Sequence, residues 1–90
     1  MERYGYGMKI KESIVTEKMS DGNFMIFDSD NGNFLITNEI GKFIIDSLIE
    51  NNEKNMIIQN IFSIYEVDVD AIENDYEYFL NLLAEYGLCE

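Results

Sequence analysis

Residues 23–37 read Asn-Phe-Met-Ile-Phe-Asp-Ser-Asp-Asn-Gly-Asn-Phe-Leu-Ile-Thr, two short apolar runs around a polar turn. Runs rich in Phe, Ile and Thr favour β-strands, and Asn-Gly tolerates the positive φ angles that tight hairpins require. A third run, residues 13–19, lies upstream and is separated from residue 23 by Ser20-Asp21-Gly22. The pattern predicts a three-stranded antiparallel meander with strands at 13–19, 23–28 and 33–37.

The segment after residue 37 has helical periodicity. Asn38 can cap a first helix whose apolar positions repeat at helical spacing as far as Leu48, and Asn51-Asn52 can end it. A second helix is expected over residues 54–66, where isoleucines recur every three or four positions.

A third helix has start and stop signals of its own. Asp70 and Glu73 form a capping-box-like pair, Val69 precedes them as a possible hydrophobic staple, and Gly87 is placed to end the helix. A meander followed by three helices predicts an α+β, winged helix-turn-helix-like fold in which the helices cover one sheet face.

The length and composition bound the domain organisation. Ninety residues, 47% of them hydrophobic, are sufficient for one domain, which we expect at 13–90 after a flexible N-terminal segment at 1–12. No apolar run is long enough for a membrane span or a signal peptide, so a cytoplasmic location is expected. The only cysteine, Cys89, excludes an internal disulfide.

The ionisable residues argue against catalysis and against nucleic acid as a partner. Histidine is absent, which removes the commonest general base and metal ligand, and we expect no catalytic residue, metal or cofactor. Asp28, Asp30, Glu73, Asp75 and Glu77 are interpreted as solvated surface charges. A net charge of −12 repels nucleic acids and anionic membranes, whereas it attracts a basic peptide or protein face.

The expected third strand is an edge without the usual protection against foreign strands. Residues 33–37 contain no lysine or proline, whereas the first strand carries Glu17 and Lys18. Such an edge is either shielded by a neighbouring helix or available to an added strand. The third helix has a second row of residues that either widens its core stripe or lines a groove for an extended ligand: Asp75, Tyr78, Leu82 and Glu85.

The stretch Gly32-Asn33-Phe34-Leu35-Ile36-Thr37-Asn38-Glu39-Ile40-Gly41 resembles the strand-to-helix signature of the PqqD-like family, an aromatic strand that runs into Asn-Glu-x-Gly. Val67-Asp68-Val69-Asp70 and Gly87-Leu88 resemble the family's link between its last helices and its Gly-Leu ending. The resemblance extends over about residues 13–88.

The resemblance implies a recognition domain for ribosomally synthesised and post-translationally modified peptides. Members bind the leader segment of a precursor peptide as an added strand beside the third helix. By resemblance, the edge would be Asn33, Phe34, Leu35, Ile36 and Thr37, and the wall Asp75, Tyr78, Phe79 and Leu82. Because no enzyme domain accompanies these residues, we expect a free-standing adaptor for a separate modifying enzyme, such as a radical enzyme or a leader peptidase.

Two other functions remain open from the residues themselves. A winged-helix transcriptional regulator would need a basic recognition helix, yet residues 70–90 contain no Lys or Arg. A structural or oligomerising subunit, such as a homodimer, would use the second sheet face, for which the alternation suggests Val15, Met25, Phe27 and Leu35.

Overall fold

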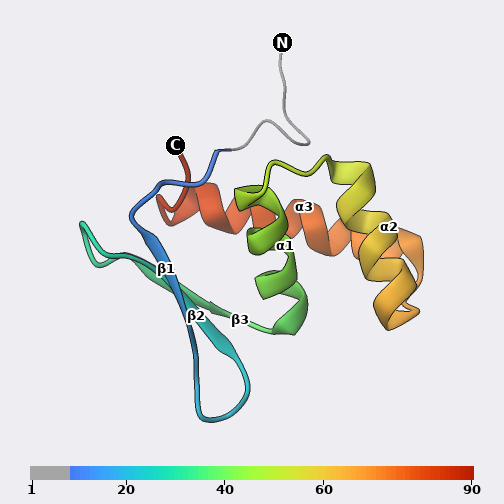
Figure 1. Cartoon of the computed structure of the whole chain (residues 1–90), viewed down its shortest axis with the longest axis horizontal. Helices are drawn as coiled ribbons and strands as arrows, with labels where there is room; N and C mark the ends of the chain where they lie inside the picture. Colours follow the sequence, from blue (N-terminus) through green and yellow to red (C-terminus); the bar gives the residue numbers. More distant parts are fainter. Residues whose placement is uncertain (1–8) are drawn as a thin grey trace.

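Three antiparallel strands form one sheet, and three helices pack on one side of it, in a computed structural model that describes residues 9–90 (Figure 1). The strands are β1 (Ile14–Lys18), β2 (Phe24–Asp28) and β3 (Phe34–Thr37), and they lie in the order β1-β2-β3. The predicted meander and the α+β class are confirmed. Because β2 is central, β1 and β3 are the two edges of the sheet.

The two hairpin turns depend on glycines with positive φ. Gly22 has φ 93° and donates its N–H to the Met19 carbonyl, and Gly32 has φ 81° and donates to the Asp28 carbonyl. Only glycine reaches such angles without steric cost. Each strand is one or two residues shorter than predicted, because the residues at the predicted strand ends belong to the turns and loops that flank them.

Asp28 departs from the prediction of a solvated turn residue. Its side chain is 1% exposed, and its Oδ1 accepts the Asp30 N–H at 2.9 Å while Lys11 Nζ lies 3.4 Å from Oδ2. Hydrogen bonds from Ser13 and Asp30 hold the pKa of this carboxyl below its ordinary value. Asp28 therefore joins the end of β2 to the segment that precedes β1.

The strand register decides which side chains face the helices. Ile26 lies opposite Leu35, and both are buried, 0% and 6% exposed. The opposite sheet face carries apolar side chains instead: Val15, Met25, Phe27, Phe34 and Ile36. Leu35 was predicted on this outer face, and the prediction is wrong. All three central residues of β3 are apolar, so their alternation alone does not show which one faces the core.

The helices are α1 (Glu39–Ile49), α2 (Lys54–Tyr65) and α3 (Val69–Glu85). The predicted cap of α1 is confirmed, because Asn38 Oδ1 accepts the Gly41 N–H at 3.0 Å. The end of α1 is confirmed too. Asn51 has φ 64°, and the N–H groups of Asn51 and Asn52 bond back to the carbonyls of Leu48 and Ser47, which is a Schellman ending.

The start of α3 differs from the prediction by two residues. Asp68, not Asp70, is the N-cap, because its carbonyl accepts the first helical bond from Ile72. Val69 packs against the core as a helical residue, which draws the helix start upstream. Gly87, with φ 70°, ends the helix as predicted, and its N–H bonds to the Ala84 carbonyl.

The core lies where the three helices meet the inner sheet face. The helix α3 crosses behind α1 and α2 in Figure 1 and packs against both. Burial raises the pKa of Tyr76, which is 0% exposed, to about 12. The other fully buried side chains of the same core come from the sheet, the three helices and the segment after α3: Ile26, Ile44, Ile45, Ile57, Ile61, Leu83 and Leu88.

The N-terminal part of the described chain is packed rather than loose. Ile10 is 8% exposed and forms an antiparallel bridge with Cys89, and the Glu90 N–H donates to the Lys9 carbonyl at 2.7 Å. Residues 9–12 thus belong to the folded domain, contrary to the predicted boundary at residue 13. The remainder of the segment predicted to be flexible, residues 1–8, lies outside the described residues.

Candidate functional site

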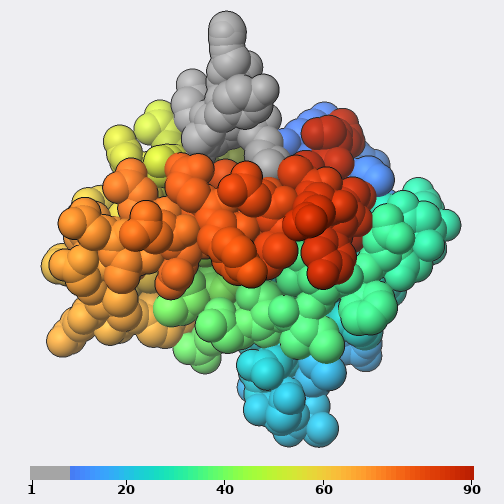
Figure 2. Space-filling model, turned by 180° about the vertical axis from the view of Figure 1, so that it is seen from behind, coloured from blue at the N-terminus to red at the C-terminus, as the bar shows by residue number. Residues whose placement is uncertain are grey.

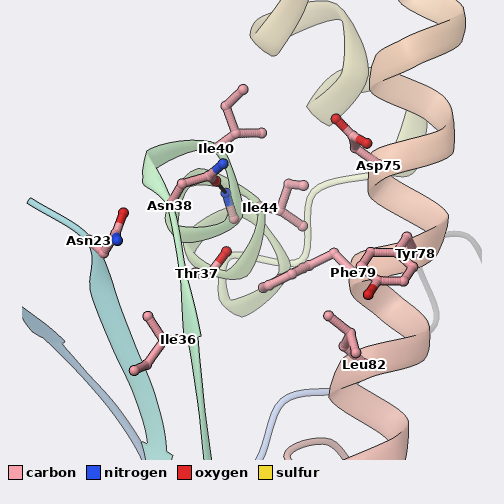
Figure 3. A pocket seen from close by; sticks show the side chains of 11 residues that line it. Asn23, Ile36, Thr37, Asn38, Ile40, Ile44, Asp75, Tyr78, Phe79 and Leu82 are labelled. Carbon is pink, nitrogen blue, oxygen red and sulfur yellow. Dashed lines mark hydrogen bonds between the residues drawn. The ribbon is translucent and has the colours of Figure 1, made fainter.

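A cavity of about 530 Å³, called here the Tyr78 cavity, lies between β3, the start of α1 and α3 (Figure 3). Phe79 extends from α3 toward β3, and Ile36 and Thr37 lie on the opposite side. Six residues predicted for the peptide site meet here: Ile36, Thr37, Asp75, Tyr78, Phe79 and Leu82. Its other lining residues were assigned to the α1 stripe or not singled out for the site: Asn23, Asn38, Ile40, Gly41 and Ile44.

The junction between β3 and α1 shapes one wall of the Tyr78 cavity. A Cβ built on Gly41 would overlap Thr37 Oγ1 and lie 2.8 Å from Thr37 Cβ. Glycine at position 41 therefore lets the first turn of α1 approach the end of β3. Together with the Asn38 cap, this explains physically why Asn-Glu-x-Gly follows a strand here.

The helix α3 supplies the opposite wall with two kinds of side chain. Phe79 and Leu82 pack against the core, whereas Tyr78 is 65% exposed. The predicted second row of α3 therefore does not merely widen the core stripe. An exposed aromatic ring beside an apolar floor is a surface on which another chain can bury area.

A second cavity of about 510 Å³, called here the Glu85 cavity, lies at the other end of β3. Gly32, Asn33 and Phe34 line it from the strand side, and Glu85 and Tyr86 from the end of α3. Asn33 Nδ2 donates to the Tyr86 carbonyl at 3.1 Å and fixes this end of the groove. Figure 2 shows α3, in orange to red, along the β3 and α1 residues in green.

The backbone groups at the free edge of β3 follow from the register. Asp28 N–H donates to the Asn33 carbonyl at 2.9 Å, so this pair is hydrogen-bonded across β2 and β3. Opposed pairs alternate in an antiparallel ladder, so Leu35 and Thr37 also direct their N–H and C=O groups to β2. Phe34 and Ile36 therefore direct theirs to the free edge.

Leu35 thus differs from Phe34 and Ile36, although all three were expected to form the edge. Its side chain is in the core, and its backbone groups bond to β2. Leu35 therefore anchors β3 to the core and to β2, and only Phe34 and Ile36 present backbone groups at the free edge. The sequence alone did not distinguish these three residues.

Four acidic residues of α3 form two sets. Glu73 and Glu77 both contact Lys54 Nζ, at 3.3 Å and 2.6 Å, on the side of α3 that faces α2. Asp75 and Glu85 line the two cavities, and within residues 9–90 neither has a Lys or Arg partner. The groove therefore has an apolar centre and a carboxylate at each end.

Comparison with known proteins agrees with the geometry. The family model for coenzyme PQQ synthesis protein D (PqqD) matches residues 23–88. The chain belongs to the PqqD family. The matched residues include β2, β3 and all three helices, and every residue that lines the two cavities of this PqqD-family domain lies within the match. No protein with a curated description is significantly similar.

Two solved structures resemble this PqqD-family domain over nearly their full length. One is TbiB1 in complex with the TbiA(beta) leader peptide, with a TM-score of 0.75, 28% identity, and coverage of 92% of this chain and 95% of that one. The other is lasso peptide synthetase B1 complexed with the leader peptide, with a TM-score of 0.76, 20% identity, and coverage of 92% and 96%. The second likeness shows the shared fold.

The described residues contain neither a candidate metal site nor a candidate membrane span. Residues 9–90 contain no group of three or more Cys, Asp or Glu side chains arranged to hold a metal ion. Within the same residues, no helix combines the length and apolarity that a membrane span requires. The groove between β3 and α3 therefore stands as the candidate site.

Proposed function

We propose that this domain binds the leader segment of a ribosomally made precursor peptide, which adds as a strand to the edge of β3. The observation that carries the proposal is the free edge of Phe34 and Ile36, which has no protecting charge and faces a groove lined by α3. Support comes from the leader peptides named in the two similar structures.

The edge alone cannot account for useful affinity. Phe34 and Ile36 offer one N–H and one C=O each, and a hydrogen bond contributes about 1 kcal/mol net. Micromolar binding requires about 8 kcal/mol in addition to the cost of association. Side chains of the leader must therefore fill the Tyr78 cavity, where Tyr78, Phe79 and Leu82 can bury apolar groups.

We further propose that the domain is a non-catalytic adaptor that works in the cytoplasm and presents the leader to a separate modifying enzyme, such as a radical enzyme or a leader peptidase. An apolar groove with a bare strand edge suits binding, whereas general acid–base catalysis requires a positioned titratable group.

Titration with fluorescently labelled leader segments, encoded by precursor genes beside the gene for this chain, tests the proposal. We expect at least one leader to bind with a micromolar or lower Kd, and Tyr78→Ala to weaken it. A set of neighbouring leaders that all fail to bind, with or without the modifying enzyme present, would contradict leader recognition.

A second candidate function, self-association, is favoured by the outer sheet face. Val15, Phe34 and Ile36 are 43%, 50% and 51% exposed there. Sedimentation velocity of the wild type and of Val15→Lys is the test: a dimer that the substitution dissociates supports this role, and a monomer at all concentrations excludes it.

A further inference from the structure

The two cavities lie at opposite ends of one strand edge. Thr37 lines the Tyr78 cavity, and Asn33 lines the Glu85 cavity and bonds to Tyr86. The strand β3 and the helix α3 therefore run in opposite directions along the groove. The four residue steps from Asn33 to Thr37 span about 13 Å of strand, and the seven steps from Tyr78 to Glu85 span about 10 Å of helix.

A strand added to β3 would meet both cavities at a fixed spacing. The sheet is antiparallel throughout, and antiparallel pairing is slightly more stable than parallel pairing. In that orientation, the added residue opposite Thr37 precedes the one opposite Asn33 by four positions. Both residues lie on the face toward α3, because paired residues share a face of the sheet.

The chemistry of the two cavities differs. Ile44, Phe79 and Leu82 give the Tyr78 cavity an apolar lining that suits a large apolar side chain, and Asp75 is also among its lining residues. The Glu85 cavity combines a carboxylate that lacks a cationic partner within residues 9–90 with the ring of Tyr86, which is 45% exposed. A Lys or Arg fits this second cavity, because its stem can lie on the Tyr86 ring and its charge can reach Glu85.

We propose that Glu85 is a specificity-determining residue and that the domain selects leaders with a large apolar residue at one position and Lys or Arg four positions later. The inference rests on the proposed strand addition at β3. It deepens that function by assigning a charged subsite beside the apolar one. Asn33 holds the subsite in place through its bond to the Tyr86 carbonyl.

Selection from an mRNA-displayed library of random peptides tests the inference with wild type, Glu85→Lys and Glu50→Lys. Glu85 is the last residue of α3, where a lysine complements the helix dipole, so Glu85→Lys should fold. Glu50→Lys makes the same charge change at the exposed C-cap of α1, outside both cavities. Ile36→Pro, which removes an edge donor, reports whether selected peptides bind as an added strand.

We expect wild type and Glu50→Lys to enrich Lys or Arg four positions after a large apolar residue, and Glu85→Lys to enrich Asp or Glu there instead. Replacing that Lys or Arg with Ala in one selected peptide should weaken wild-type binding about tenfold and leave Glu85→Lys binding unweakened. Peptides that require the Ile36 edge yet show no charge preference at this position would overturn the subsite and leave strand addition standing. Peptides indifferent to Ile36→Pro, or no enrichment at all, would overturn both.

Discussion

The two edge strands of the sheet differ although both pair with β2. β1 carries Glu17 and Lys18, both exposed charges, whereas β3 carries Phe34 and Ile36, both apolar and about half exposed. Charges on an edge discourage foreign strands, because pairing would bury them. The contrast indicates that one edge is closed to new strands and that the other is left open beside a groove.

Proline substitution at each edge should give the largest difference. Ile36→Pro removes an edge N–H of β3 that makes no bond to β2 and places the ring against an incoming strand. We expect leader affinity to fall about 100-fold or more, because the peptide would lose two or more backbone hydrogen bonds and its alignment with β3. Fluorescence anisotropy with a binding leader measures the change.

Thr16→Pro is the matched control on β1. Val15 and Glu17 form the hydrogen-bonded pairs with β2, since Ser29 N–H bonds to the Ser13 carbonyl, so the Thr16 N–H is also directed to a free edge. Circular dichroism should show that both variants are folded. Equal loss of affinity in the two variants would show that the edges are not distinct.

Gly41→Ala should give the next largest effect, on stability. The added methyl group meets Thr37 Oγ1 and Cβ, so α1 must move away from the end of β3. We expect the free energy of unfolding to fall by about 2 kcal/mol, as for other overpacked sites. Urea denaturation measures it, and Thr37→Ala in the same chain should restore part of the loss. A Gly41→Ala variant as stable as wild type would show that the approach is not tight.

Tyr78→Ala should separate binding from folding on the open side of the molecule. The ring is 65% exposed, so its loss should change the urea midpoint little. Leader affinity should fall about tenfold, as for a moderate aromatic contact in an interface. The matched variant is Tyr86→Ala, with a ring 45% exposed in the Glu85 cavity. If neither Tyr78→Ala nor Tyr86→Ala changed leader affinity, the peptide would bind outside the groove between β3 and α3.

Much of the fold could be predicted because its signals are local. Gly22, Gly32 and Asn38 each act within a few residues of the turn or cap that they form. The bridge between Ile10 and Cys89 could not be predicted, because it joins residues far apart in the chain. The sheet face on which the Leu35 side chain lies could not be predicted either, because Phe34 and Ile36 on either side of it are equally apolar.

The smallest expected effect concerns Asp28, whose side chain joins the end of β2 to the segment that precedes β1. The folded-state pKa of Asp28 is lowered, so its stabilisation is present above the unfolded pKa of about 3.9 and is lost as pH falls through the folded value. Asp28→Asn should therefore lower the urea midpoint slightly at pH 7. The difference in urea midpoint between wild type and Asp28→Asn should become smaller below pH 4. If the difference in urea midpoint did not change with pH, the charge of Asp28 would not be what stabilises the end of β2.

Amide hydrogen exchange, measured by NMR with and without a binding leader, tests strand addition at β3 most directly. The amides of Phe34 and Ile36 should become protected when the leader binds, while the Thr16 amide at the β1 edge stays unchanged. Protection at Thr16, or binding that leaves Phe34 and Ile36 unprotected, would contradict the assignment of β3 as the edge that receives the peptide.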